Sequence, residues 1–229
     1  MTNARRPSRR RIPVQPGLVI ERLVPVYGPV EWRQRMDPLD ELIFTVLTQH
    51  TSDLNAERAF KQMRARYPAW RDVLDAPVED LTDAIRSGGL ANQKSARLQL
   101  ILADILKRHG RFDLAFLGAM SMDEARSWLL ALPGVGPKTA AVVLAFSFGM
   151  PAMPVDTHVH RVSRRLGLIS KKTTADDAHP ILEDLIKPED RYMAHVLLIA
   201  HGRRTCKALH PLCGNCALND VCPSRETQV

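Results

Sequence analysis

Apolar residues along most of this 229-residue chain recur with the spacing of an α-helix. The pattern predicts helices near 54–66, 78–86, 92–108, 158–166, 176–186 and 190–204, with a short helix near 17–25. No alternation of apolar and polar residues longer than four residues indicates a strand, and no internal repeat is visible. The sequence therefore predicts an all-α protein.

Helix-starting signals define two further helices. In DPLDELIFTVL, Asp37 is suited to be the N-cap and Pro38 the first helical residue, and apolar residues follow at 42, 43, 46 and 47. In SMDE, Ser121 and Glu124 fit a capping box that opens a helix to about residue 131. The later MPAMP segment, 150–154, is too rich in proline to be helical throughout and marks a domain boundary.

Composition narrows the class of protein. Hydrophobic residues make up 45% of the chain and charged residues 25%, which is ordinary for a globular protein, and the net charge of +7 favours a polyanionic partner. No run approaches the ~18 apolar residues of a membrane span, and no secretory signal is recognisable, so we expect a cytoplasmic protein. Five arginines, at 5, 6, 9, 10 and 11, form either a solvated tail or an arm that grips phosphates.

The stretch LPGVGPKTA, 132–140, predicts a tight turn between two helices. Gly134 and Gly136, on either side of Val135, permit positive φ and leave backbone N–H groups uncovered, and Pro137 suits the first turn of a helix beginning near Lys138. Unpaired amides at a helix start bind phosphate, so this hairpin is suited to hold a nucleic-acid backbone. A plain connection between helices is the alternative.

All four cysteines lie in the last 24 residues, with six, two and five residues between them. Such a cluster in a chain without a secretory signal favours a metal over disulfides. Structural zinc usually uses two pairs with two to four intervening residues, and only one pair here fits, so the wider spacing favours an iron–sulfur cluster. Zinc, and then free thiols or disulfides, remain the alternatives. The four residues are Cys206, Cys213, Cys216 and Cys222.

These motifs resemble the endonuclease III family of helix–hairpin–helix DNA glycosylases, over roughly residues 35–222. The cysteine spacing is similar to the family's C-terminal [4Fe–4S] loop, whose cluster has a structural or a redox-sensing role and does not take part in base removal. The family's lysine nucleophile corresponds to Lys138, and a helix start suits it because the positive end of the helix disfavours the ammonium form. A phosphate-binding lysine is the alternative. VDTH matches the family's catalytic aspartate at Asp156, which is also suited to be an N-cap.

The resemblance implies a two-lobed all-α fold. One lobe is a six-helix barrel at 31–150 that ends in the hairpin, and the other joins 1–30 to 151–229 and carries the [4Fe–4S] cluster. It also implies a substrate cleft between the lobes, with Lys138 and Asp156 facing across it. We expect a monomer that binds double-stranded DNA with a damaged base or an abasic site, and no membrane partner.

The implied activity is base excision with abasic-site lyase activity on oxidised pyrimidines such as thymine glycol. Attack of Lys138 on C1′ would expel the base and form a Schiff base, and β-elimination would cut the strand. Alternatives are a monofunctional glycosylase for mispaired uracil, thymine or adenine, and a non-catalytic DNA-binding protein. Thr45 stands near the place where adenine-removing relatives carry a catalytic glutamate.

Base removal requires the base to leave the stack, which needs residues that open the duplex. By resemblance, GGLANQKSARL places a leucine wedge at Leu90. LTQHTSD is similar to a loop whose glutamine fills the gap, but here the aligned residue is His50 and Gln49 precedes it. Asp53 closes that loop, and a helix cap is its alternative role.

Two further sets of residues complete the predicted DNA contacts. His158, beside the aspartate motif, is either a catalytic helper or a packing residue. Between the first two cysteines only Lys207 and His210 are basic or titratable, where the family often has several basic residues. Arg203 and Arg204, just before that loop, are suited to compensate.

Overall fold

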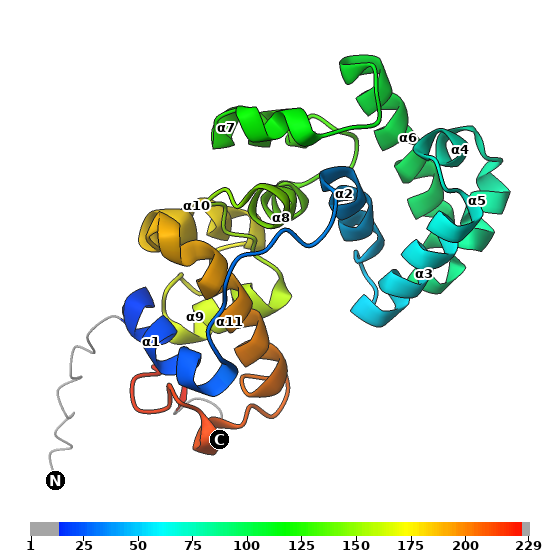
Figure 1. Ribbon diagram of the computed structural model, residues 1–229. Helices are drawn as coiled ribbons and strands as arrows, with labels where there is room; N and C mark the ends of the chain where they lie inside the picture. Colours follow the sequence, from blue (N-terminus) through cyan, green and yellow to red (C-terminus); the bar gives the residue numbers. More distant parts are fainter. Residues whose placement is uncertain (1–13, 226–229) are drawn as a thin grey trace, which may run out of the picture. The chain divides into compact units, whose positions relative to one another are not determined.

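The computed structural model describes residues 14–225, and the arginine-rich stretch predicted as a tail lies outside them. Within this range the chain forms eleven α-helices joined by loops and short 3-10 helices, and no β-strand (Figure 1). The all-α prediction is confirmed. By their contacts the residues form two compact units, Trp32–Pro154 and a second one that combines the chain up to Glu31 with the chain from Val155 onward.

The Trp32–Pro154 unit contains seven helices. They are α2 (Pro38–Leu47), α3 (Asp53–Arg66), α4 (Trp70–Asp75), α5 (Val78–Ala84), α6 (Ala91–His109), α7 (Met122–Leu130) and α8 (Pro137–Phe148), with 3-10 helices at Arg86–Gly88 and Ala115–Ala119. α8 packs against α2 and α7, whereas α6 packs against α4 and α5 (Figure 1). Almost every residue of α8 from Thr139 onward is buried, so this helix is central to the unit.

The second unit contains α1 (Pro16–Tyr27), α9 (Thr157–Leu166), α10 (Ala175–Leu185), α11 (Arg191–Arg204) and a 3-10 helix, Cys213–Asn215. α11 packs against both α1 and α9. α9 is strongly amphipathic, with Val159, Val162 and Leu166 buried and Arg164 exposed. The cysteine-rich segment follows α11 directly.

The predicted helix starts are present. Asp37 caps α2 by accepting a hydrogen bond from the Leu39 N–H at 3.0 Å. Ser121 and Glu124 form the capping box of α7. The third expected cap is different, because Ser52 rather than Asp53 caps α3. The sequence pattern did not reveal α4, whose six residues are too few to show a helical period.

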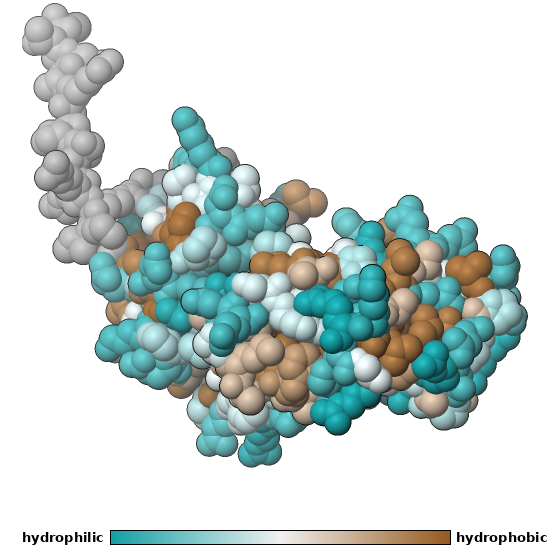
Figure 2. Space-filling model, turned by 90° about the horizontal axis from the view of Figure 1, so that it is seen from above, coloured by the Kyte–Doolittle hydropathy of each residue, from teal (hydrophilic) through white to brown (hydrophobic). Residues whose placement is uncertain are grey.

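Hydrophilic residues cover most of the described surface seen in Figure 2, and hydrophobic residues appear there in smaller patches. Among the described residues, no helix combines the length and apolar character that crossing a membrane requires.

Candidate nucleic-acid interface and cysteine pocket

The hairpin between α7 and α8 is a tight turn with two buried apolar side chains. Leu132 and Val135 are buried, and the Val135 N–H donates to the Leu132 carbonyl at 3.2 Å. Gly134 uses the left-handed region, with φ 75°, whereas Gly136 is extended, with φ −98° and ψ 179°. α8 then begins at Pro137, so that its first amides lie at the turn, where a helix start attracts phosphate.

Lys138 is the second residue of α8 and is half-buried. The next residue, Thr139, is buried and connects the hairpin to the loop after α2. Its Oγ1 accepts a long hydrogen bond from Gln49 Nε2 at 3.4 Å, and Arg97 Nη1 donates to Gln49 Oε1 at 3.0 Å. The Gln49 amide is therefore held on both sides, beside the first turn of α8.

Arg97 also fills the space beside the hairpin glycine. A Cβ at Gly134 would lie only 2.7 Å from Arg97 Cδ and Nε. One arginine on α6 thus contacts the hairpin and the Gln49 side chain together. Sequence reasoning missed Arg97, because nothing in its local pattern distinguishes it from other arginines of an amphipathic helix.

His50 and Leu90 share an unusual backbone conformation. Their φ angles are 53° and 49°, in the left-handed region that non-glycine residues rarely adopt. Both side chains are exposed, Leu90 by 49%. Each residue thus presents its side chain to solvent from a constrained loop, and Leu90 immediately precedes α6.

Asp156 is the N-cap of α9 in the other unit. Its Oδ1 accepts the Val159 N–H at 2.7 Å, which holds the half-buried carboxylate in one orientation. The cap predicted for this residue is confirmed.

His158, two residues further along α9, packs against α11. A Cβ at Gly202 would lie 2.9 Å from His158 Cβ, so only glycine there permits the close approach of the two helices. The His158 ring is also in contact with Arg161, with 3.2 Å between Nδ1 and Nη2. These are the contacts expected of a packing residue, the second of the two roles predicted for His158.

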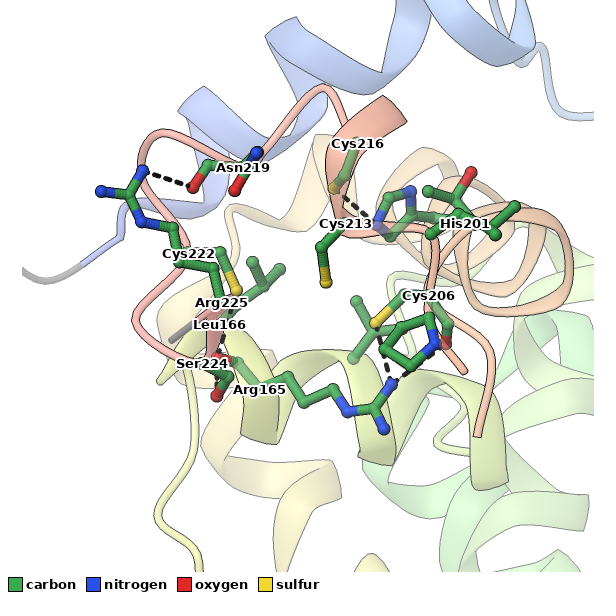
Figure 3. A pocket seen from close by; sticks show the side chains of 14 residues that line it. Arg165, Leu166, His201, Cys206, Cys213, Cys216, Asn219, Cys222, Ser224 and Arg225 are labelled. Carbon is green, nitrogen blue, oxygen red and sulfur yellow. Dashed lines mark hydrogen bonds between the residues drawn. The ribbon is translucent and has the colours of Figure 1, made fainter. Parts of the chain in front are cut away.

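The four cysteines surround one pocket, as Figure 3 shows. The pocket comprises about 410 Å³, part of it open to solvent, and apolar side chains such as Val162, Leu166 and Leu212 complete its lining. The sulfur atoms come from the loop after α11, from the 3-10 helix and from the segment beyond it. Cysteines up to 16 positions apart in the sequence thus line the same pocket. The members are Cys206, Cys213, Cys216 and Cys222.

Hydrogen-bond donors surround these sulfur atoms. Arg165 Nη1 lies 3.3 Å from Cys206 Sγ, and the Leu218 N–H lies 3.4 Å from Cys216 Sγ. Burial raises the pKa of the Cys216 thiol and of the Cys222 thiol above the ordinary value of a cysteine. At Cys216 the hydrogen bond from the Leu218 N–H acts in the opposite direction and lowers the pKa. Such donors favour the thiolate form that a metal requires.

His201 closes the pocket from α11. Its Nε2 lies 3.6 Å from Cys216 Sγ, and its Nδ1 lies 3.0 Å from the Tyr27 hydroxyl of α1. Burial lowers the pKa of His201 to about 4, so the imidazole is neutral near pH 7 and one ring nitrogen donates while the other accepts. The pocket is thereby connected to two helices of its unit.

Arg161 and Arg165 attach the beginning of the cysteine loop to α9. Arg161 Nη2 donates to the carbonyls of Gly202 and Cys206, at 2.8 and 3.1 Å. Arg165 donates to the Lys207 carbonyl at 2.6 Å and the Ala208 carbonyl at 3.0 Å. The helix that starts at Asp156 therefore also holds the cysteine loop. Sequence reasoning missed this role of the two arginines.

The remaining predicted contacts lie on the surface. Lys207, Arg203 and Arg204 are exposed, and Arg204 stacks over the Tyr27 ring at 5.7 Å. His210 is exposed in a left-handed conformation, with φ 50°. These basic groups adjoin the cysteine loop, where they are accessible to a polyanion.

Four thiols are a possible donor set for a zinc ion and for an iron–sulfur cluster. Among residues 14–225, no group of three or more Cys, His, Asp or Glu side chains is arranged to hold one metal ion. Zinc would need four sulfur atoms about 2.3 Å from one point. A [4Fe–4S] cluster instead gives each cysteine its own iron, and the four cysteines that line this pocket supply that number of thiols.

Comparison with known proteins places the chain in a family. Residues 43–188 match the family model described as HhH-GPD superfamily base excision DNA repair protein. The chain therefore belongs to the HhH-GPD superfamily of base excision DNA repair proteins, and the resemblance inferred from its motifs is confirmed.

Individual relatives agree with this membership. The chain is 38% identical to endonuclease III of Thermotoga maritima, over 81% of this chain and 83% of that protein. It is 35% identical to a "putative DNA glycosylase" of Arabidopsis thaliana over 82% of this chain, but spans only 61% of that protein's length. A solved structure of a trapped endonuclease III–DNA covalent intermediate superposes with a TM-score of 0.79 at 30% identity, covering 92% and 95% of the two chains.

Proposed function

We propose that this protein is a base-excision DNA glycosylase with abasic-site lyase activity that removes oxidised pyrimidines from duplex DNA. The observation that carries the proposal is a lysine, Lys138, in the first turn of α8 directly after a phosphate-binding type of hairpin. The covalent endonuclease III–DNA intermediate among the similar structures supports it, since that protein forms a bond to its substrate.

In the proposed reaction, the neutral amine of Lys138 attacks C1′ of the damaged nucleotide. The bond from C1′ to the base breaks, the base takes the electron pair and a proton, and the sugar ring opens to give an imine. Loss of a proton from C2′ then breaks the C3′–O bond by β-elimination and releases the 3′ part of the strand. Water hydrolyses the imine and returns the free lysine.

Asp156 would stabilise the positive charge that develops at C1′ and help the lysine to lose its proton. Its fixed orientation supports this role, because the Val159 N–H holds one carboxylate oxygen. A preorganised charge that faces a developing charge typically contributes about 3 kcal/mol to the transition state.

Local contacts support His50 over Gln49 as the residue that fills the gap left by the flipped base. The Gln49 amide is held by Arg97 and Thr139 within its own unit, whereas the His50 side chain is exposed in a left-handed loop. Leu90, also exposed and left-handed, is the proposed wedge. A histidine in the gap would change the hydrogen bonds offered to the orphan base.

Borohydride trapping tests the proposal. The protein is mixed with duplexes that contain an abasic site, thymine glycol, uracil or adenine opposite oxidised guanine, with Lys138→Gln alongside and Lys107→Gln as a control on an exposed lysine. We expect adducts with the abasic and thymine-glycol duplexes, lost in Lys138→Gln and kept in Lys107→Gln. Base loss without an adduct would make the enzyme monofunctional, and no reaction at all would leave a DNA-binding protein.

We further propose that the cysteine pocket holds a [4Fe–4S] cluster. Cys206, Cys213, Cys216 and Cys222 would each bind one iron, and the cluster would supply structure to the loop rather than base-removal chemistry. Purified protein should be yellow-brown and contain about four irons and four sulfides per chain. A colourless protein with one zinc per chain would contradict this proposal.

A further inference from the structure

Two loops that carry exposed side chains lie beside each other in the Trp32–Pro154 unit. A Cβ at Gly89 would lie 3.9 Å from the His50 carbonyl oxygen and from Thr51 Oγ1. The loop after α2 carries His50, and the loop before α6 carries Leu90. The two exposed side chains therefore belong to one local surface.

Both loops need support to keep their backbone conformation. A non-glycine residue in the left-handed region is strained, and such residues persist only where their surroundings hold them. His50 and Leu90 are two of the three such residues among residues 14–225, with φ angles of 53° and 49°. Atoms that contact both loops are suited to give such support.

Lys94, in the first turn of α6, contacts both. Its side chain is only 2% exposed, and its Nζ donates to the carbonyls of Leu47 and Gly88, at 2.7 Å each. Leu47 is the last residue of α2, three residues before His50, and Gly88 ends the 3-10 helix two residues before Leu90. One buried ammonium group thus joins the starting points of both loops.

We propose that Lys94 is a positioning residue that holds His50 and Leu90 in the single arrangement with which they enter duplex DNA. The inference rests on the proposed function, because it assigns these two residues to duplex opening. Burying a lysine is costly unless its donors are satisfied, and here two main-chain carbonyls accept two of its three N–H groups. The carbonyl end of α2 also attracts a cation through the helix dipole.

The bridge does not depend on the charge alone. Burial, assisted by the neighbouring Arg97, lowers the pKa of Lys94 to about 8. A neutral amine keeps two N–H groups, one for each carbonyl. An apolar side chain of similar length, as in Lys94→Met, removes both hydrogen bonds and keeps most of the volume.

The first test compares two abasic substrates. Lys94→Met, wild type and the control Lys107→Met, on an exposed position of the same helix, are mixed with an abasic duplex and with an abasic single strand, which needs no opening. We expect the ratio of duplex to single-strand trapping rates to fall about tenfold in Lys94→Met, the usual scale for a lost hydrogen bond to a charged group. An unchanged ratio would overturn the proposal.

The second test is independent of activity. Amide hydrogen exchange should become at least tenfold faster in both 48–52 and 88–90 in Lys94→Met, whereas exchange in α8 should keep its wild-type rate. Unchanged loops, or equal acceleration throughout the unit, would contradict the positioning role. If Lys94→Met does not fold, Lys94→Gln, which keeps one –NH₂ donor, is measured against the same criteria. If the wild type traps neither substrate, the proposed function fails, and the exchange result still decides whether Lys94 holds the loops.

Discussion

Glu41, in α2, is a carboxylate with no exposed surface, and its ion pair decides what it contributes to stability. Arg35 Nε donates to Glu41 Oε2 at 3.0 Å, and a second contact joins Nη2 to Oε1. The guanidinium also lies 5.2 Å from the centre of the Phe44 ring. A buried charge left without its partner is strongly destabilising, although the intact pair itself can be nearly neutral.

We therefore expect Arg35→Ala to lower the free energy of unfolding by about 3 kcal/mol, because Glu41 would stay buried without a cation. Urea unfolding at pH 7 measures it. Arg86→Ala is the matched control, since the Arg86–Asp83 pair is exposed and such pairs contribute about 0–1 kcal/mol. Equal effects of the two substitutions would show that burial of Glu41 does not determine the loss.

The protonation of Lys94 leads to a prediction about how stability depends on pH. Its pKa is about 8 in the folded chain and near 10.5 in the unfolded chain, so between these values the unfolded state binds more protons. The free energy of unfolding should therefore rise with pH in this window, by up to about 1.4 kcal/mol per pH unit. The difference between wild type and Lys94→Met isolates this effect, and a difference that falls with pH would contradict it.

At the scale of elements, the turn between α7 and α8 distinguishes its two glycines. Gly134 has φ 75° and Arg97 directly beside it, whereas Gly136 has an extended backbone and no neighbouring atom within 4 Å of the place that a Cβ would take. Only the first glycine is required by conformation. The turn therefore depends on one glycine for its shape, although the pattern G-V-G treats the two alike.

We expect Gly134→Ala to destabilise the protein by roughly 1–2 kcal/mol, the usual cost of a left-handed alanine, and to displace Arg97 from Gln49. Gly136→Ala should stay within about 0.5 kcal/mol of wild type. Thermal unfolding of both variants without DNA measures this, since a phosphate contact cannot then affect the result. Similar losses in both would indicate that Gly136 also has a conformational role.

For the molecule as a whole, net charge bears on the DNA binding that we propose. The formal net charge is +7, and five arginines between residues 5 and 11 supply most of it, because residues 2–12 contain no acidic side chain. These residues lie outside the described range, so their contribution is predicted from sequence alone. Counterion release makes such a contribution depend steeply on salt.

Replacing the five arginines by glutamine should lower the formal net charge to +2 and weaken binding to undamaged duplex about tenfold at low salt. The slope of log K against log salt should become shallower by about 0.9 for each phosphate that the variant no longer neutralises. Replacement by lysine keeps the charge and should keep the slope. An unchanged slope in the glutamine variant would show that this segment does not touch DNA.

Features that depend on residues close together in the chain were predictable from the sequence. Periodicity predicted most helices, and the caps at Asp37, Ser121 and Asp156 are present, because a cap involves residues within three positions of each other. The hairpin and the cysteine cluster were also recognisable, since each is a short motif. The roles of Lys138 and of the four cysteines in chemistry stay predictions.

Contacts between residues far apart in the chain became visible only in the folded protein. Lys94 donates a hydrogen bond to a carbonyl 47 positions away in the sequence. Arg97 donates one to Gln49, 48 positions away, and Arg165 donates one to the Lys207 carbonyl, 42 positions away. The left-handed backbone of His50 and Leu90 was also not predicted, because a non-glycine residue keeps that conformation only where its surroundings support it. No local pattern encodes such pairs, since their partners are chosen by the packing of helices rather than by spacing along the chain.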